Sequence, residues 1–238
     1  SFHSKVTVGT VEEALRRGAD GVSMHINLGD SREPDMLRDL GAMGAACADW
    51  HLPLLVMAYV RGSHAPSLVP DAAIAHAARI AAELGADIVK IPPPADLDVM
   101  AAIAAGASVP VVVAGGSRKL AAPEFLAQME RYLAAGARGV AVGRNVFQHE
   151  NPGAFLQAIV QIVHEGRSAE EARAGETAAR AAAPRNAARR QACRTGASRF
   201  LTSTTGEPGD EVVAAGAEAE HRGGLLHPRL ADSRRARR

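Results

Sequence analysis

The feature of this sequence that most constrains its fold is a regular alternation of short apolar runs with helical segments before residue 172. Five runs are continuously apolar, whereas a strand with one face in water would alternate apolar and polar residues. The pattern is typical of parallel strands that helices cover on the outside. We expect these strands at residues 21–27, 52–59, 86–91, 109–116 and 138–143.

Local signals predict helices in the gaps between these strands. Thr10 and Glu13 form a T-x-x-E capping box, and Asp71 is placed to cap the helix that ends at Gly85. The tripeptides GAD, GAD and GAR precede three of the strands, and each joins a helix-ending glycine to entry into a strand. The repeating unit of about 24–32 residues predicts a (β/α)8 barrel or a doubly wound sheet.

Two further features favour the barrel. The last two strands end in AGGS and VGRN, and barrels often bind phosphate with the loops after strands seven and eight. On this interpretation the chain holds strands four to eight, and the first strands of the barrel are absent from it. A barrel also assembles its active site at the carboxyl ends of its strands. The candidate residues at those ends are His25, Asn27, Tyr59, Arg61, Lys90, Gly115, Gly116, Ser117, Gly143 and Arg144.

The composition changes near residue 172. The segment 173–238 contains 13 arginines, no lysine and seven acidic residues, so it carries a charge of +6 within a chain of net charge +1. Its few branched aliphatic residues cannot bury enough surface to offset the entropy lost on ordering. We therefore expect a partial (β/α)8 barrel over 1–172 and an Ala/Arg-rich, largely disordered tail over 173–238. A basic tail can bind nucleic acid, but the expectation is a solvated extension with no such partner.

The same composition excludes several other classes of protein. The only two cysteines, Cys47 and Cys193, cannot form a disulfide framework. The sequence contains no C-x-x-C motif, so it does not predict a structural zinc site. The sequence contains no run of 18 apolar residues, so it predicts no membrane span. The first ten residues lack the apolar segment of a signal peptide. The expectation is a cytoplasmic protein without a membrane partner.

Lys90 is the strongest candidate nucleophile. The chain has only three lysines among its 27 basic residues, and one of them lies inside an apolar strand, in the stretch ADIVKI. An amine attacks a carbonyl only in its uncharged form, which apolar burial and nearby positive charge favour. From its position alone, Lys90 is equally well explained as a strand-end lysine that reaches water or pairs with a carboxylate.

The other candidates each have a functional and a structural explanation. Tyr59 can move a proton or can be a strand-end tyrosine whose hydroxyl meets water. Arg61 can hold a phosphate or a carboxylate in its planar fork, or can be a surface arginine. His25 and Asn27 lie two residues apart and so point to one side of their strand. They either shape a substrate pocket or form a hydrogen-bonded pair in the barrel.

The glycine-rich strand ends are candidates for phosphate binding. Gly115, Gly116 and Ser117 follow one strand, and Gly143 and Arg144 follow the next. Glycine has no Cβ, so the backbone N–H groups can approach a phosphate closely. Two such ends on consecutive strands after the lysine strand make a more specific signal than either alone.

Five segments, in order and at natural spacing, resemble one known family. They are TVEEALRRGADGVSMHINLG, AYVRG, HAARIAAELGADIVKIPP, PVVVAGGSRK and GVAVGRNVFQHENP. Together they resemble the DeoC/archaeal-type class I fructose-bisphosphate aldolase family over about residues 5–172. Within it the sequence is most similar to the branch of 2-amino-3,7-dideoxy-threo-hept-6-ulosonate synthases and their actinobacterial relatives.

The resemblance implies a (β/α)8 barrel and a role for each matching residue. It implies a covalent imine on Lys90 with no other cofactor, a proton donor at Tyr59, and phosphate loops at Gly115–Gly116 and Gly143–Arg144. The family's general base is an aspartate on strand one, which is not in this sequence, and Val60 replaces the proline of the family's YPRG motif. It also implies a small phosphorylated substrate and a homo-oligomer at full length.

Three functions follow from these observations. The first is a Schiff-base aldolase of the amino-heptulosonate synthase type, which joins a sugar or triose phosphate to aspartate semialdehyde; Met57 favours it, since fructose-bisphosphate aldolases tend to carry tryptophan there. The second is fructose-bisphosphate aldolase. The third is an inactive aldolase fragment that only binds phosphate. A phosphate-binding isomerase on the same fold would need a strand-end carboxylate base, for which residues 1–172 offer no strong candidate.

Overall fold

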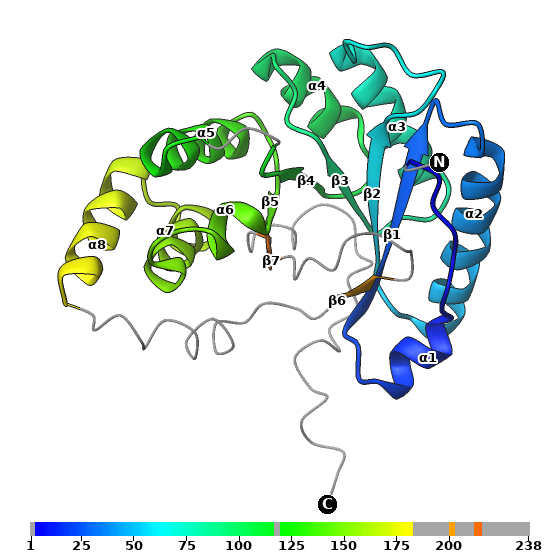
Figure 1. Cartoon of the computed structure of the whole chain (residues 1–238), viewed down its shortest axis with the longest axis horizontal. Helices are drawn as coiled ribbons and strands as arrows, with labels where there is room; N and C mark the ends of the chain where they lie inside the picture. The colour runs from blue at the N-terminus through cyan, green and yellow to red at the C-terminus, as the bar shows by residue number, and fades with distance from the viewer. Residues whose placement is uncertain (1–2, 117–119, 183–199, 203–211, 216–238) are drawn as a thin grey trace, which may run out of the picture.

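A computed structural model of the chain describes residues 3–116, 120–182, 200–202 and 212–215. Helices lie along the outer side of a curved sheet, with α2 and α3 beside β1 and β2, and α5 and α7 on the side of β5, while α8 lies farther out against α5 and α7 (Figure 1). The strands of the sheet are β1 Gly21–Leu28, β2 Leu54–Val60, β3 Ile88–Ile91, β4 Val111–Ala114, β5 Gly139–Val142, β6 Phe200–Thr202 and β7 Val212–Ala215. The helices are α1 Val11–Arg16, α2 Glu33–Trp50, α3 Asp71–Glu83, α4 Leu97–Gly106, α5 Ala122–Ala134, α6 Arg144–Phe147, α7 Pro152–Glu165 and α8 Ala169–Ala182.

The strands β1 to β5 form a consecutive parallel sheet, which confirms the predicted order of strand and helix. The strands β2 to β5 all start one or two residues later than predicted, and for two of them the start follows a proline. β2 begins after Pro53 and β4 after Pro110, because proline has no N–H to donate to a neighbouring strand. The carbonyl groups of both prolines still accept hydrogen bonds from the adjacent strands, at 2.9 Å from Val22 and 3.0 Å from Val89.

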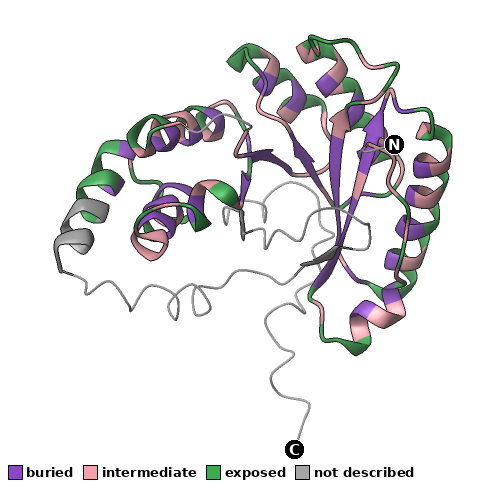
Figure 2. Ribbon diagram, viewed as in Figure 1, coloured by how far each residue is buried: buried purple, intermediate pink, exposed green. Residues whose placement is uncertain are grey.

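The two faces of the sheet carry different residues. Every second residue of β1 to β5 belongs to the hydrophobic core shared with the helices; this outer set includes Val22, Met24, Ile26, Leu28, Leu54, Val56, Ala58, Val89, Ile91, Val111, Val113, Val140 and Val142. The alternate residues form the opposite face, which we call the inner face, and most of them are also buried (Figure 2). A row across the inner face runs through His25, Met57, Lys90 and Val112. The continuous apolar runs therefore arise because both faces of the sheet are buried.

The predicted helix signals are mostly confirmed. The Thr10 hydroxyl accepts a hydrogen bond from the Glu13 N–H, and Gly18 and Gly85 have the positive φ angles of helix-ending glycines. The predicted cap at Asp71 is wrong. α3 begins at this residue, and its carboxylate accepts hydrogen bonds from the backbone N–H groups of Ala95 and Asp96, at 3.2 and 3.0 Å.

The predicted domain boundary at residue 172 falls inside α8, which packs against α5 and α7. Two short segments of the predicted tail join the sheet at its edges. β6 pairs with β1 in parallel, and β7 pairs with β5 in antiparallel orientation. The rest of the tail beyond residue 182 lies outside the described residues, so its predicted disorder stays a prediction. Among the described residues, no helix is long and apolar enough to cross a membrane.

Cys47 lies on the buried side of α2, and its surroundings make it a poor nucleophile. Burial, with a smaller contribution from the charge of Asp87, raises the pKa of its thiol to about 11. Because the thiolate is the reactive form, its fraction at neutral pH falls about 100-fold. In a Cys193→Ser variant we expect Cys47 to react slowly with a thiol reagent at pH 8 and quickly after unfolding in urea. Equal labelling rates with and without urea would contradict this burial.

Candidate active site

The inner face gathers four of the predicted site residues. β1 contributes His25 and Asn27, β2 contributes Tyr59, and β3 contributes Lys90. Alternation along each strand places all four on the side away from the helix-packed core. The register pairs Asn27 with Tyr59 one row above the row that contains His25 and Lys90. Residues that are far apart in the sequence therefore meet on one surface.

Lys90 lies at the centre of this surface. Lys90 is 3% exposed, and its neighbours on the adjacent strands are Met57 and Val112. The apolar neighbours that the sequence suggested, Val89 and Ile91, point to the helix side instead. The amine is thus carried by a buried residue that lies between two apolar side chains of the sheet. This burial differs from that of an exposed lysine at a strand end.

Tyr59 lies diagonally next to Lys90 on the same face. Neighbouring strands are about 4.8 Å apart and two residues of a strand span about 6.6 Å, so the Cβ atoms of this pair lie about 8 Å apart. A lysine amine and a phenol that extend from such positions can both reach one small molecule. The Arg61 guanidinium lies over the Tyr59 ring, 4.2 Å from its centroid. This cation–π contact restrains the ring from the solvent side.

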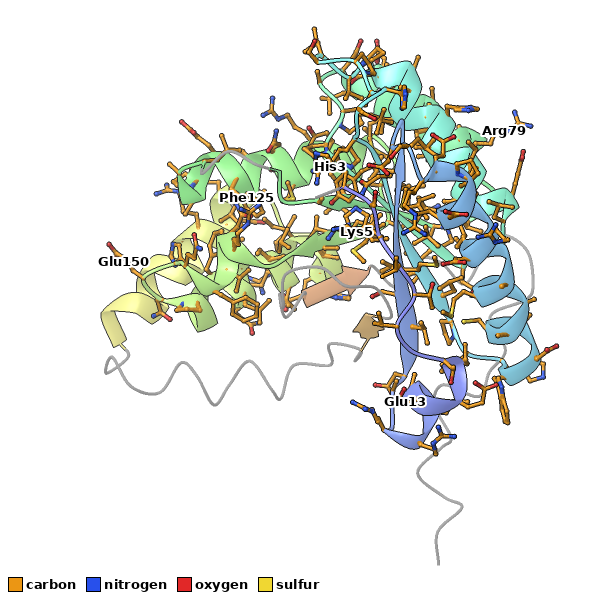
Figure 3. The ribbon with its side chains drawn as sticks, turned by 45° about the vertical axis from the view of Figure 1, so that its right-hand side comes forward. His3, Lys5, Glu13, Arg79, Phe125 and Glu150 are labelled. Carbon is orange, nitrogen blue, oxygen red and sulfur yellow. The ribbon has the colours of Figure 1, made fainter. Side chains whose placement is uncertain are left out.

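His25 and Asn27 form a hydrogen-bonded pair that also holds the start of the chain. His25 Nε2 lies 3.1 Å from Asn27 Oδ1, and Asn27 Nδ2 donates to the His3 carbonyl oxygen at 2.6 Å. Figure 3 shows the segment with His3 and Lys5 close to β1, while Glu13 lies on α1 at the other end of that strand. The His25 ring also lies 5.0 Å from the Tyr59 ring, between centroids. His25 thereby links the start of the chain to the proposed proton donor.

The two glycine-rich strand ends lie against each other. A Cβ on Gly115 would collide with the Asn145 side chain, so the loop after β4 touches the residues after β5. Gly116 has φ of +75°, a conformation that favours glycine, and Gly143 precedes the four-residue α6, whose first residue Arg144 is exposed. Ser117 lies outside the described residues. The phosphate role of these residues stays a prediction that their proximity supports.

The loop that follows Lys90 is held from two sides by contacts that the sequence analysis missed. The Asp71 carboxylate binds the backbone N–H groups of Ala95 and Asp96, and the Tyr132 hydroxyl donates to the Pro94 carbonyl oxygen at 2.8 Å. Tyr132 is buried on α5. The triple proline that ends the strand was the available signal, because such a segment leaves carbonyl groups that need donors from elsewhere.

No group of three or more His, Cys, Asp or Glu residues within the described ranges is arranged to hold a metal ion. The inner face brings together an amine, a phenol and an imidazole, and these groups can support addition of the amine to a carbonyl with nearby proton transfer.

Comparisons with known proteins agree with this geometry. The family model described as DeoC/LacD family aldolase matches residues 1–149. The chain is 43% identical over 178 residues to a 2-amino-4,5-dihydroxy-6-oxo-7-(phosphonooxy)heptanoate synthase of Streptomyces griseus, covering 74% of this chain and 65% of that protein. It is 42% identical to 2-amino-3,7-dideoxy-D-threo-hept-6-ulosonate synthase 1 of Archaeoglobus fulgidus, over 71% of this chain and 62% of that protein.

The structure resembles that of an archaeal fructose-1,6-bisphosphate aldolase whose catalytic lysine is covalently bound to the carbinolamine intermediate of its substrate. The TM-score is 0.61 at 36% sequence identity, over 65% of this chain and 62% of that one. The units β1 to β5 thus form part of a (β/α)8 barrel, as predicted from the sequence. The chain spans slightly less than two thirds of the length of these relatives.

Proposed function

Since this chain belongs to the DeoC/LacD family of aldolases, we propose that it is a class I aldolase that makes or breaks a carbon–carbon bond through an imine on Lys90. The observation that carries the proposal is the placement of this lysine. Its residue is 3% exposed, it lies at the centre of the inner face, and Tyr59 lies on the same face one strand away. No cofactor is required, because the covalent imine supplies the electron sink.

The proposed reaction begins with the uncharged amine of Lys90. Its lone pair attacks the carbonyl carbon of a ketone, and a net transfer of one proton from the nitrogen to the carbonyl oxygen gives a neutral carbinolamine. Loss of that hydroxyl as water, with one further proton, leaves a protonated imine. The imine nitrogen accepts the electron pair of an adjacent C–C or C–H bond, which gives an enamine. The first step needs this uncharged form, and Lys90 lies buried between Met57 and Val112.

Tyr59 is the proposed proton carrier. In condensation, the enamine carbon attacks an aldehyde, and the phenol O–H gives its proton to the aldehyde oxygen as the new C–C bond forms. In cleavage, the phenolate takes the same proton back while the bond breaks. The Arg61 guanidinium over the ring, 4.2 Å from its centroid, would help to keep the phenol in place for this transfer.

The proposed substrate is a phosphorylated keto sugar or triose. Backbone N–H groups at Gly115, Gly116 and Gly143, with Arg144, would hold the phosphate, and His25, Asn27 and Arg61 would contact the rest of the molecule. The sequence identity of 43% and 42% to two synthases of the amino-heptulosonate type supports a sugar or triose phosphate and aspartate semialdehyde as the two reactants. Met57 next to Lys90 supports the same choice.

Fructose-bisphosphate aldolase is the second candidate, supported by the structural similarity to an archaeal enzyme of that activity. The inactive, phosphate-binding form is the third. The proposal also includes a cytoplasmic homo-oligomer at full length, as the family resemblance implies.

Reductive trapping tests the proposal. We expect that incubation with dihydroxyacetone phosphate and sodium borohydride leaves one reduced adduct per chain, on the peptide that contains Lys90. The other two lysines, Lys5 and Lys119, serve as internal controls and should stay unmodified. A folded protein that gives no adduct, or an equal adduct on all three lysines, would refute imine chemistry at this site. An adduct at Lys90 without turnover of either substrate pair would favour the inactive form.

A further inference from the structure

We infer that His25 is held in a single tautomer, with its proton on Nε2, so that its Nδ1 lone pair is a hydrogen-bond acceptor for a hydroxyl of the substrate bound to Lys90. The substrate part of this inference rests on the proposed function. The tautomer part rests only on hydrogen bonds of the described residues. It makes His25 a specificity residue of the site instead of a packing residue of the barrel.

The tautomer follows from a chain of three groups. The His3 carbonyl oxygen can only accept, so the Asn27 atom 2.6 Å from it must be the amide nitrogen. The other end of that amide is then its oxygen, which also can only accept. It lies 3.1 Å from His25 Nε2, so this ring nitrogen must carry a proton and donate. A backbone carbonyl at the start of the chain thereby sets the tautomer, through a residue that is 1% exposed.

The surroundings of His25 keep the ring neutral. Burial is the main cause that lowers the pKa of His25 to about 4, and three cations contribute: Lys5 from the N-terminal segment, Arg61 after β2 and Lys90 on β3. The hydrogen bond to Asn27 acts in the opposite direction and raises the pKa. The uncharged Tyr59 ring lies against the imidazole from β2. At neutral pH, Nδ1 is therefore an unprotonated acceptor.

The position of this acceptor suits a substrate hydroxyl. His25 and Lys90 lie in the same row of the inner face, with only Met57 between them. Two strand spacings, about 9.6 Å, separate their Cβ atoms, a distance that a keto sugar attached to the lysine can bridge. The cations around His25 offer no acceptor to a sugar hydroxyl, so a neutral acceptor complements them. A deoxy substrate lacking that hydroxyl gains nothing from it.

Two amide substitutions of His25 distinguish the roles of its two ring nitrogens. H25N can place an amide oxygen where Nδ1 lies but lacks the donor to Asn27, whereas H25Q can keep the donor to Asn27 but lacks the acceptor. We expect H25Q and H25A to trap dihydroxyacetone phosphate on Lys90 about 10-fold or more slowly than the wild type, and H25N to trap it clearly faster than H25Q. Melting temperatures verify that all three variants fold. An H25Q rate equal to or above that of H25N would overturn the substrate contact.

NMR of the imidazole nitrogens tests the tautomer without any catalysis. The signal of His25, identified by its loss in H25N, should show a proton on Nε2 and a bare Nδ1 from neutral pH down to about pH 5. A proton on Nδ1 of the neutral ring would overturn the tautomer, and titration near 6.5 would overturn the neutral acceptor that the substrate contact needs. If the wild type forms no adduct on Lys90 while the NMR result holds, the proposed function fails and the tautomer stands. An adduct on Lys90 together with a proton on Nδ1 of His25 gives the reverse result: the proposed function stands and the tautomer fails.

Discussion

Replacing Lys90 with methionine should abolish adduct formation with dihydroxyacetone phosphate and lower the aldol rate by about 10⁴-fold or more, because no other group on the inner face can form an imine. That loss corresponds to about 5 kcal/mol of transition-state stabilisation. The measurement is kcat/KM for the aldol reaction, together with mass spectrometry of the borohydride-treated protein. Methionine suits the position, because the neighbours in the row are Met57 and Val112.

The same substitution should leave the fold intact. Methionine matches lysine in length and its neighbours in the row are apolar, so we expect the variant to unfold cooperatively in a melting experiment. K90R is the matched control, because it keeps a positive charge but cannot form an imine; it should also fail to trap. Turnover in folded K90R or K90M near the wild-type rate would contradict the proposed role of Lys90.

Replacing Gly62 with alanine should destabilise the protein by about 3–5 kcal/mol. Gly62 has a φ angle of +142°, which residues with a side chain rarely adopt. The Cβ of an alanine at this position would overlap Asp30 and the Gly29 carbonyl oxygen. Its loop is fixed against the end of β1 by hydrogen bonds from Arg61 N to Leu28 O at 2.9 Å and from His64 N to Gly29 O at 2.8 Å. The backbone on both sides therefore has little room to move.

Urea denaturation measures this effect, and Gly41→Ala supplies the control. Gly41 lies within α2, and nothing lies within 4 Å of its would-be Cβ. Alanine there should stabilise the protein by about 0.5–1 kcal/mol, since it replaces a glycine inside a helix. Because Arg61 follows β2 directly before Gly62, the remaining folded G62A protein should also bind substrate more weakly. A G62A midpoint equal to that of the wild type would show that the two loops are not packed as described.

Much of the fold was accessible from the sequence because the relevant signals are local. The apolar runs predicted five strands, and the capping box at Thr10 and the glycines at 18 and 85 predicted helix ends that the structure confirms. The placement of Lys90 and Tyr59 on one face was also accessible, because it follows from parallel strands in sequence order and from the alternation of side chains along each strand. These features depend on the backbone alone.

Features that depend on contacts between distant segments were not accessible. Asp71 is a residue type that often caps helices, yet its carboxylate accepts hydrogen bonds from the N–H groups of Ala95 and Asp96, about 24 residues away, just after the triple proline. The link from His3 through Asn27 to His25 likewise joins a segment without a regular element to a strand. No periodicity in the sequence marks either contact.

The two restraints on the loop after β3 have a consequence for how the amine moves. Helices α3 and α5 anchor the backbone just beyond Lys90, through Asp71 and Tyr132. The Cα of the lysine is thus fixed within the sheet, and adjustment during a reaction cycle is left to the four torsions of its side chain. Rotation about these side-chain torsions can then accommodate the successive intermediates, from the tetrahedral adduct to the planar imine, while the backbone of the sheet keeps its position.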